Sequence, residues 1–407
     1  MTDAIIVLNA GSSSLKFSLF AEAGVEPAVV TSGQIGSIDT SPHFIAKDSA
    51  GQTASEKRWA QGTQLGHDGA VAHLVDWLKA TYASHYQLVG VGHRVVHGGV
   101  DYSATVRIDP GVVAKLEKLI PLAPLHQPHN LAPIRSLMER TPQLPQVACF
   151  DTAFHRSNPP LAQMFALPSE LTESGVRRYG FHGLSYEYIA SVLPKFDERA
   201  ARGKTVVLHL GNGASMCSLQ AGASVASTMG FTALDGIPMG TRPGQIDPGV
   251  LLYLLTEKGM KPAAVQDLLY RESGLQGLSG ISNDMRELQS NPDPRAMLAV
   301  DHFVYRIGLN AGMLAAALGG LDAFVFTAGV GENSPTIRAR IAEKLAWLGA
   351  VLDPADNAAG KRVISKPESR IPLLVEPTDE ELMIAKHTLA LQSERSGGAA
   401  LGQRLAV

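Results

Sequence analysis

The first 150 residues alternate between short apolar runs and helical stripes. Ala4–Asn9 (AIIVLN) is apolar, a Gly/Ser turn follows, and Leu15–Phe20 (LKFSLF) resumes with period two. This pattern predicts a strand, a tight turn and a second strand. The other elements expected here are a helix over Gly66–Ala83, strands over Val89–Val96 and Gln146–Phe150, and a helix over Pro128–Met138.

The second half of the chain begins in the same way. Thr205–Leu210 (TVVLHL) is apolar, GNGAS follows, and then MCSLQ. When residues 7–19 are set against residues 207–219, identical residues occur at Val7/Val207, Leu8/Leu208, Gly11/Gly211, Ser18/Ser218 and Leu19/Leu219. Both segments open an α/β unit, so we expect two similar domains that face each other across a cleft.

The later elements fit a large second domain. We expect a helix over Arg295–Leu318, a strand over Asp322–Thr327 that runs into Gly329–Asn333, and a closing helix over Glu380–Leu391. The acidic first turn of the closing helix suits the helix dipole. Residues from Ser393 onward lack periodicity and are predicted to be a frayed tail.

Composition narrows the class of protein. The 407 residues carry a net charge of −3, which provides no overall basic field for nucleic acid or an anionic membrane. No apolar stretch reads as a membrane span. The start of the chain lacks the basic segment of a signal peptide, and two cysteines are too few for a disulfide framework. These features predict a cytoplasmic protein.

Three glycine-rich turns follow predicted strands: Asn9–Ser14, Gly211–Ser215 and Gly329–Asn333. Backbone N–H groups in such turns can converge on a phosphate, and Lys16 lies two residues beyond the first turn. The plain alternative is that each is only a tight turn. None fits the P-loop or dinucleotide-binding pattern, so a phosphate site formed by a single loop is not expected.

Several histidines lie near the ends of predicted strands, which raises the alternative of a zinc hydrolase. His93 and His97 stand in HRVVH, which lacks the glutamate of H-E-x-x-H and alternates like a strand. A structural, hydrogen-bonded role is therefore favoured for each histidine.

Arg94 and Arg242 are the arginines of greatest interest. Arg94 lies in an apolar strand and Arg242 in a Met-Gly-Thr-Arg-Pro-Gly turn. A poorly solvated guanidinium needs a carboxylate or a phosphate. Asp151, at the end of a strand, could be a structural partner of such an arginine. A buried Arg–Asp pair and a phosphoryl clamp both remain open.

The motifs together resemble one family, and they run through nearly the whole chain in order. They are VLNAGSSSLKFSLF (7–20), GHRVVHGG (92–99), PLAPLHQPHN (121–130), FDTAFH (150–155), RRYGFHGLSYEY (177–188), HLGNGAS (209–215), MGTRPGQIDPG (239–249), ISNDMRE (281–287), GVGENSP (329–335) and PTDEELMIA (377–385). The sequence resembles the acetate kinase family, within the superfamily of acetate and sugar kinases, actin and heat-shock chaperone ATPases.

The resemblance implies an α/β fold of two duplicated actin-like (ribonuclease H-like) domains, with mixed sheets flanked by helices and the active site in the interdomain cleft. The N-terminal domain would span residues 1–150 and be joined by the C-terminal helix, residues 385–407. The nucleotide-binding domain would span residues 151–384. A homodimer is also implied.

The implied reaction is the reversible transfer of phosphate from ATP to acetate, which gives ADP and acetyl phosphate by direct in-line transfer. Magnesium is implied, with manganese as a substitute, and the metal ligands would be Asn9 and Glu380. The implied catalytic residues are Asp151, His182 and Arg242. The implied substrate-binding residues are Arg94, Val96, Leu125 and Phe181. The implied nucleotide-binding residues are Lys16, His209, Leu210, Gly211, Asn212, Gly213, Asp284, Met285, Arg286, Gly329, Val330, Gly331, Glu332 and Asn333.

Physical chemistry agrees with these roles. A carboxylate is already a nucleophile, so positioning and charge neutralisation dominate the catalysis. Negative charge spreads over the equatorial oxygens of the transferring phosphoryl group, where Arg94, Arg242, His182 and magnesium can meet it. Asp151 is expected to orient an arginine or a water, because acetate carries no proton to remove at neutral pH.

Two positions depart from the family pattern. Ala233 replaces a proline beside the implied methyl pocket, which could widen that pocket and admit propionate. Propionate kinase, or a broader short-chain carboxylate kinase, is therefore the alternative function. Gln245 stands where an aspartate is common. A nucleotide-switch protein like actin is a third reading, against which Arg94, His182 and Arg242 argue together.

Overall fold

A computed structural model describes residues 1–24 and 26–402 of the chain. The chain divides into two compact units. Unit 1 contains residues 1–153 and the residues from Asp379 onward, and unit 2 contains residues 154–378. The sequence places these boundaries at 150/151 and 384/385, a few residues away in each case.

Unit 1 is built on one mixed sheet, which has eight strands within the described residues, in the order β5-β4-β3-β2-β1-β6-β8-β7. Strand β1 pairs antiparallel with β2 and parallel with β6, and β6 pairs parallel with β8. The strands are β1 (Thr2–Ala10), β2 (Ser14–Ala21), β3 (Ala28–Gly36), β4 (His43–Asp48), β5 (Thr53–Arg58), β6 (Tyr86–Val95), β7 (Val106–Arg107) and β8 (Gln146–Phe150).

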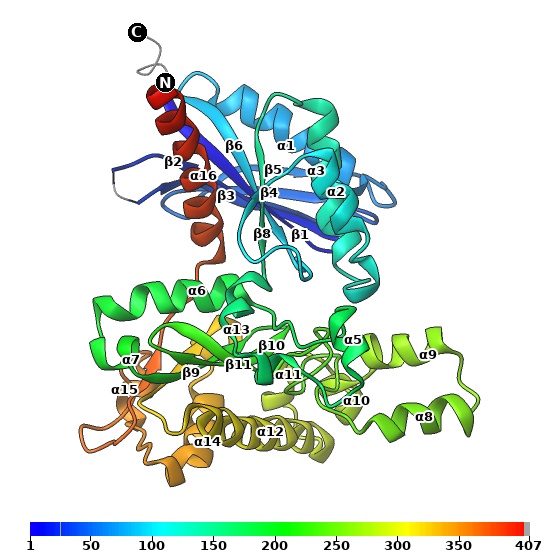
Figure 1. Cartoon of the computed structure of the whole chain (residues 1–407), viewed down its shortest axis with the longest axis vertical. Coiled ribbons are helices and arrows are strands. Elements are labelled where there is room, and N and C mark those ends of the chain that lie inside the picture. Colours follow the sequence, from blue (N-terminus) through cyan, green and yellow to red (C-terminus); the bar gives the residue numbers. More distant parts are fainter. Residues whose placement is uncertain (25, 403–407) are drawn as a thin grey trace. The chain divides into compact units, whose positions relative to one another are not determined.

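Helices cover both faces of this sheet (Figure 1). One face carries α1 (Gly66–Tyr82) and α3 (Gln127–Arg140), with α2 (Pro110–Glu117) packed on α3. The other face carries α16 (Glu380–Gly402) against β1 and β6. Strand side chains alternate between faces, so every residue of β1, β2 and β6 belongs either to an α1 face or to an α16 face.

Helix α16 approaches β6 closely because glycines occupy the strand there. A Cβ atom on Gly92 would lie 2.4 Å from Thr388 Oγ1 and 2.6 Å from Ile384 Cγ2, and one on Gly90 would lie 2.7 Å from Gln392 Nε2. Any larger residue would push the helix away from the strand. The absence of side chains at these two positions therefore fixes where α16 lies on the sheet.

Unit 2 repeats the core topology of unit 1. Within the described residues its sheet has five strands, in the order β11-β10-β9-β12-β13, which matches β3-β2-β1-β6-β8. The β9–β10 pair is antiparallel, and β9–β12 and β12–β13 are parallel. The strands are β9 (Lys204–Leu210), β10 (Ala214–Gln220), β11 (Ala223–Ser227), β12 (Ala323–Thr327) and β13 (Leu373–Val375). The predicted duplicated α/β fold with mixed sheets is confirmed.

Most helices of the chain belong to unit 2. They are α4 (Pro160–Gln163), α5 (Ser169–Glu173), α6 (Gly183–Val192), α7 (Glu198–Arg202), α8 (Pro248–Thr256), α9 (Pro262–Asp267), α10 (Gly274–Ser279), α11 (Met285–Ser290), α12 (Pro294–Leu318), α13 (Ala328–Asn333), α14 (Pro335–Leu345) and α15 (Pro354–Ala358). Helix α12 begins with Asp293 as its N-cap, whose side chain accepts from the Arg295 N–H, and ends at Gly319 in the left-handed region.

Two predictions about local structure are wrong. Gly329–Asn333 is not an open turn but most of the helix α13, because the chain enters a helix directly from β12. The predicted frayed tail from Ser393 is helical as far as Gly402, since a helix that has already formed gains one backbone hydrogen bond for each residue added. Residues 403–407 of that tail lie outside the described residues.

Among the residues that the structure describes, no helix is long and apolar enough to cross a membrane.

Candidate functional site

In unit 1, the predicted site residues gather on the α16 face of the sheet. Ile6 and Leu8 of β1 belong to the core cluster with α1, so Asn9 points to the opposite face. The same alternation places Lys16 opposite Leu15 and Phe17 on β2, and Asn9 and Lys16 are register partners. Arg94 follows Gly90 and Gly92 on the α16 face of β6. Period-two alternation thus brings these three side chains to one face.

Arg94 and Asp151 form a paired hydrogen bond, as the sequence suggested they might. Arg94 Nε donates to Asp151 Oδ1 at 3.0 Å, and Nη2 donates to Oδ2 at 2.6 Å. Asp151 is almost fully buried, at 1% exposure. Burial alone would lower the pKa of the Arg94 guanidinium, but the charges of Asp151 and Glu380 raise it above its ordinary value. Arg94 therefore keeps its positive charge inside the fold.

The same guanidinium lies beside both predicted metal ligands. Arg94 Nη1 lies 3.4 Å from Asn9 Oδ1, and Arg94 Nε lies 3.7 Å from Glu380 Oε2. An amide oxygen and a carboxylate oxygen thus stand around one arginine. These hard oxygen donors suit Mg²⁺, which commonly takes only one or two protein ligands and completes its shell with water and substrate phosphates.

Glu381 is the next residue in the first turn of α16. Its burial raises the pKa of its carboxyl group, the negative charge of Glu380 raises it further, and Lys16 acts in the opposite direction. Within the described residues, no group of three or more His, Cys, Asp and Glu side chains could hold a metal ion. A zinc site of three such ligands therefore finds no support in the side chains described.

The histidines of HRVVH have structural bonds. His93 shares a hydrogen bond with Gln146 Oε1 at 2.7 Å, and His97 Nδ1 accepts from the Gly99 N–H at 2.9 Å. Burial lowers the pKa of each imidazole to about 4, so both rings are neutral near pH 7. These hydrogen bonds are consistent with the structural role that the sequence favoured for both histidines.

In unit 2, His182 stands at a strained backbone position. Its φ is +57°, in the left-handed region, and it is the N-cap residue of α6. Its Nδ1 shares a hydrogen bond with Ser215 Oγ at 2.8 Å, and its ring stacks on His209 with centroids 4.2 Å apart. His209 in turn shares a hydrogen bond with Ser185 Oγ at 2.8 Å. Several neighbours therefore hold the His182 ring in one orientation.

Arg242 converges with His182 on Gly213. A Cβ atom built on Gly213 would lie 2.7 Å from Arg242 Nη2 and 3.2 Å from His182 Nε2. Arg242 Nη1 donates to the Ala233 carbonyl at 2.7 Å. Burial lowers the pKa of its guanidinium, and within the described part of the chain no carboxylate forms a salt bridge with it. Its fork is therefore not occupied by a carboxylate among the described residues, and a guanidinium fork matches the geometry of a carboxylate or a phosphate.

A pocket of about 480 Å³ lies beside this pair in unit 2. It joins the turn after β9, the start of α11 and the helix α13. Of the predicted nucleotide-binding residues, it is lined by Gly211, Asn212, Asp284, Met285, Arg286, Gly329, Val330 and Asn333. It also contains Met239, Gly240, Leu275, Asn283, Gln289, Phe303 and Ser334, which the sequence analysis did not select. Nothing in the sequence was a reason to select Leu275 or Phe303, because an apolar residue in a predicted helix is usually assigned to the core.

The other predicted nucleotide residues do not line this pocket. Lys16 belongs to unit 1, whereas His209, Leu210, Gly213, Gly331 and Glu332 are chain neighbours of lining residues in unit 2. Glu332 Oε1 accepts from the backbone N–H groups of Ala328 at 2.7 Å and Thr378 at 3.2 Å. Its carboxylate thus holds the ends of two elements together. A structural role accounts for this glutamate.

At the edge of this pocket, Asp284 caps α11 and holds Arg286. Asp284 Oδ1 accepts from the Arg286 N–H at 2.8 Å, and the side chain of Arg286 donates to both carboxylate oxygens of Asp284. These side-chain hydrogen bonds lower the pKa of Asp284 to about 2. Arg286 is exposed and can move toward a ligand.

The predicted substrate-binding residues fall in both units. In unit 1, Val96 is buried, and its N–H donates to Asn130 Oδ1 at 3.0 Å; Leu125 is half-buried. In unit 2, Phe181 is buried, and its carbonyl shares a hydrogen bond with His155 Nε2 at 2.9 Å. Gln245, the second departure, accepts from Arg306 Nη2 at 2.7 Å, so the neutral amide still supplies an acceptor to that arginine.

Comparisons with known proteins find acetate kinases and a propionate kinase similar to this chain. An acetate kinase from Nitrobacter hamburgensis is 56% identical over 404 residues, which cover 99% of this chain and 100% of the relative. One from Rhizobium meliloti is 55% identical over 391 residues, with 96% and 99% covered. Among solved structures, acetate kinase from Porphyromonas gingivalis has a TM-score of 0.84 and 36% identity, with 96% and 100% covered. A propionate kinase from Francisella tularensis has a TM-score of 0.87 and 35% identity, with 95% and 99% covered.

A sequence model described as the acetokinase family matches residues 4–386. That span contains every site residue predicted from the sequence. The match covers nearly the whole chain, and the relatives above match it from end to end. The chain therefore belongs to the acetokinase family.

Proposed function

We propose that this chain is a carboxylate kinase that transfers the terminal phosphoryl group of ATP to acetate, reversibly and in line, to give ADP and acetyl phosphate. The observation that carries the proposal is the convergence of Arg242 and His182 over Gly213 beside the glycine-lined pocket. Full-length relatives named acetate kinase, at 50–56% identity, support acetate as the acid.

In the proposed mechanism, Arg94 holds the substrate carboxylate or the phosphate that it receives. Asp151 occupies Nε and Nη2 of Arg94, so it fixes the orientation of the guanidinium; Nη1, which contacts only Asn9 Oδ1 at 3.4 Å among the described side chains, is proposed to meet the ligand. Asp151 acts here as a positioning residue and removes no proton. The acetate oxygen attacks as it is, because a carboxylate is already ionised at neutral pH.

Arg242 and His182 are proposed to stabilise the transferring phosphoryl group. Its equatorial oxygens carry the developing charge, and donors that are fixed in advance lose no free energy to reorganisation as the reaction proceeds. Arg242 is held by the Ala233 carbonyl, and His182 by Ser215 and His209. The pocket lined by Gly211, Asn212 and Gly329 is proposed to bind the nucleotide.

Magnesium, when bound, neutralises charge on the ATP phosphates. Asn9 and Glu380 are proposed to hold it, with manganese as a substitute, and Lys16 is proposed to approach the same phosphates. The three residues share the α16 face of the unit 1 sheet, which supports the assignment.

The experiment is a hydroxamate assay of acetyl phosphate formation from acetate and ATP. Arg242→Ala is expected to lower kcat by about 10³-fold or more, by analogy with the arginines that assist other phosphoryl transfers, with a thermal unfolding curve close to that of the parent. Arg271→Ala, on an exposed arginine that forms an ion pair with Asp267 on its own helical turn, is the control. Near-normal turnover in folded Arg242→Ala would contradict the assignment.

Propionate is the second candidate acid. Ala233 replaces a proline of the family pattern, and one structural neighbour is named a propionate kinase. A single methylene changes discrimination by about 1–3 kcal/mol. The ratio of kcat/KM values for acetate and propionate decides between them, and we expect Ala233→Pro to shift that ratio toward acetate.

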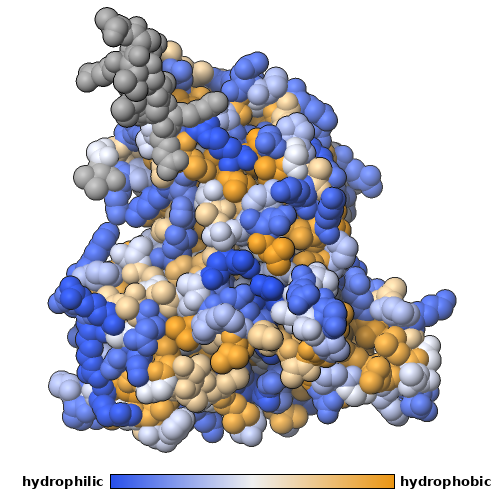
Figure 2. Space-filling view, in the orientation of Figure 1, coloured by the Kyte–Doolittle hydropathy of each residue, from blue (hydrophilic) through white to orange (hydrophobic). Residues whose placement is uncertain are grey.

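A homodimer in the cytoplasm is also proposed. Large apolar side chains are exposed along α12 and α8, and Figure 2 shows hydrophobic surface over the region of α8 and α9. The exposed residues include Leu298, Tyr305 and Leu309 on α12, and Leu252 and Tyr253 on α8. Exposed apolar patches mark interaction sites. The two buried free cysteines suit a reducing compartment.

A further inference from the structure

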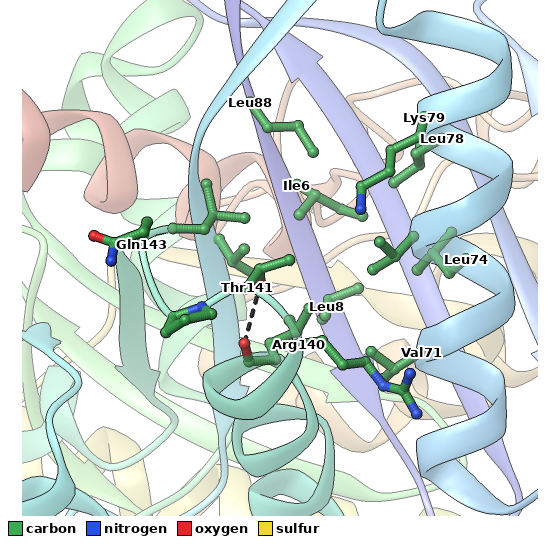
Figure 3. Close-up of a pocket in the computed structure, with 15 residues that line it drawn as sticks. Ile6, Leu8, Val71, Leu74, Leu78, Lys79, Leu88, Arg140, Thr141 and Gln143 are labelled. Carbon is green, nitrogen blue, oxygen red and sulfur yellow. Dashed lines mark hydrogen bonds between the residues drawn. The ribbon is translucent and has the colours of Figure 1, made fainter.

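The α1 face of the unit 1 sheet contains an apolar pocket of about 500 Å³ (Figure 3). Aliphatic side chains from β1, α1, β6 and the end of α3 line it: Ile6, Leu8, Leu74, Leu78, Val91 and Leu137. Since Arg94 and Asn9 point to the α16 face of the same sheet, the pocket shares no side chain with the proposed phosphoryl-transfer residues.

Two cationic side chains border the pocket. In Figure 3, the Lys79 amine turns toward Ile6 at one end, and the Arg140 guanidinium lies beside Val71 at the other. Arg140 is already engaged, because its Nη2 lies 2.7 Å from Asp68 Oδ2 and its Nε contacts Ser136. Lys79 is exposed and forms no salt bridge among the side chains that the structure describes.

Lys79 also stands where the pocket meets a smaller one. A second cavity of about 200 Å³ shares Leu78, Lys79 and Leu88 with the first and adds Leu19, Tyr82 and Tyr86. Lys79 therefore lines both of these apolar cavities. Asp76, one turn earlier on α1, is the nearest acid in sequence; it is exposed and lines neither cavity.

We propose that this pocket binds a medium-chain alkyl carboxylate, with the carboxylate on Lys79 and the chain along Leu78, Ile6 and Leu8. An apolar cavity of this size accepts a drug-sized apolar body and needs only a few polar groups for orientation. Water forms few favourable contacts with an apolar lining, whereas an alkyl chain that enters the pocket is removed from water, which is favourable. Lys79, which forms no salt bridge within the described part of the chain, matches one anionic head group.

The size of the cavity separates this ligand from acetate. Acetate has a single methyl group and would leave most of the pocket unfilled. Each additional buried methylene is expected to tighten binding about four-fold. We thus expect this site to prefer longer carboxylates, whereas a pocket that fits a methyl group prefers acetate.

The test is isothermal titration of the full chain with hexanoate, octanoate and decanoate, below their micellar concentrations and with acetate at saturation. We expect affinity to rise about four-fold per methylene. No binding of decanoate at millimolar concentration, or equal affinities along the series, would overturn the proposal. Loss of decanoate binding in Arg94→Ala would place the ligand at the substrate carboxylate site and equally overturn it.

Two variants locate the ligand. Lys79→Glu is expected to weaken decanoate binding at least ten-fold, whereas Lys118→Glu, on an exposed lysine at the C-terminus of α2, leaves it unchanged. Leu144→Trp, with Leu144→Phe as the milder change, fills the larger cavity and is expected to reduce binding. Kinase activity and the thermal melt serve as folding controls for each variant. If folded Lys79→Glu binds decanoate as tightly as the parent chain, the assignment is contradicted. The same result in folded Leu144→Trp would also contradict it.

Discussion

At the scale of single residues, Gly213 is the point on which the proposed phosphoryl-transfer groups depend. Its Cβ position is taken by the ends of Arg242 and His182. Because the nearest atom ends a flexible side chain, a methyl group there would displace the guanidinium before it disturbed the backbone. We therefore expect a substitution at Gly213 to affect catalysis more than folding.

We predict that Gly213→Ala lowers kcat by about ten-fold or more, since even small misplacements of transition-state donors are costly, while the midpoint of thermal unfolding changes little. Steady-state kinetics of acetyl phosphate formation measure the effect. Gly312→Ala, in the middle of α12 with only ordinary contact to Trp347, is the matched control. Equal kcat values for the two variants would contradict the role of Gly213.

The buried histidines make stability depend on pH. Burial lowers the pKa of His93, His97 and His155 to about 4, whereas an unfolded histidine titrates near pH 6.5. Between these values the unfolded chain binds more protons than the folded one, so stability falls as the pH decreases from 6.5 toward 4.

We predict that the free energy of unfolding drops by about 1–2 kcal/mol for each of these histidines between pH 7 and pH 5. Urea unfolding at the two pH values measures the drop. His93→Gln keeps a polar side chain beside Gln146 and should flatten the dependence, whereas His85→Gln, on an exposed histidine, should not. A pH dependence unchanged by His93→Gln would argue against the shifted pKa.

At the scale of elements, α14 supports the end of the proposed nucleotide pocket through a buried arginine. Arg338 is 1% exposed; its Nη1 donates to the carbonyls of Gly331 at 3.0 Å and Glu332 at 2.8 Å, and its Nε donates to Asn357 Oδ1 at 2.8 Å. It thus satisfies carbonyls in the last turn of α13 that have no helical partner. The shape of that turn depends on this side chain.

We predict that Arg338→Met, of similar length, raises KM for ATP about ten-fold, because α13 loses two hydrogen bonds worth about 1 kcal/mol each, while KM for acetate stays constant. Arg202→Met, on an exposed arginine of α7, is the control. Equal rises in the two KM values would indicate general destabilisation.

The elements that the sequence predicted well are those with a clear apolar pattern. The strands of the β1–β2 and β9–β10 hairpins are apolar runs that are buried on both faces, and α1 and α12 bury residues at helical spacing. Strands β3 to β5 were not predicted, because polar residues and glycines interrupt the apolar residues of β3 (AVVTSGQIG), β4 (HFIAKD) is short, and β5 (TASEKR) is almost entirely exposed. Such a strand is set by pairing with its neighbour and carries no pattern of its own.

The candidate site residues came from different sources. Arg94 stands out as an arginine in an apolar strand and Lys16 as a cation beyond a glycine-rich turn, whereas the metal-ligand role of Asn9 was implied only by the family resemblance. Strand alternation accounts for their position on one face of the sheet. Arg338 and Phe303 were missed. A charged residue in a helix, such as Arg338, looks like part of a solvated surface, and an apolar one, such as Phe303, looks like part of the core.

At the scale of the whole molecule, the exposed apolar residues of α12 and α8 predict association. We expect a homodimer by light scattering after size exclusion, and a monomer for Leu298→Glu combined with Leu309→Glu, because two charges within an apolar interface are costly. Leu161→Glu, on a leucine of α4 that is 88% exposed, is the control and should leave the dimer intact. A monomeric parent chain would contradict the proposal.

The return of the chain to unit 1 at Asp379 has a consequence for its synthesis. Unit 2 is one continuous stretch, so it can fold as soon as residue 378 has left the ribosome, whereas the sheet of unit 1 must wait for α16. Until then the groove at Gly90 and Gly92 is bare, and Arg94 lacks Glu380. While more than two hundred further residues are synthesised, the nascent chain therefore exposes part of the unit 1 sheet. We expect chaperones to bind the chain at this stage.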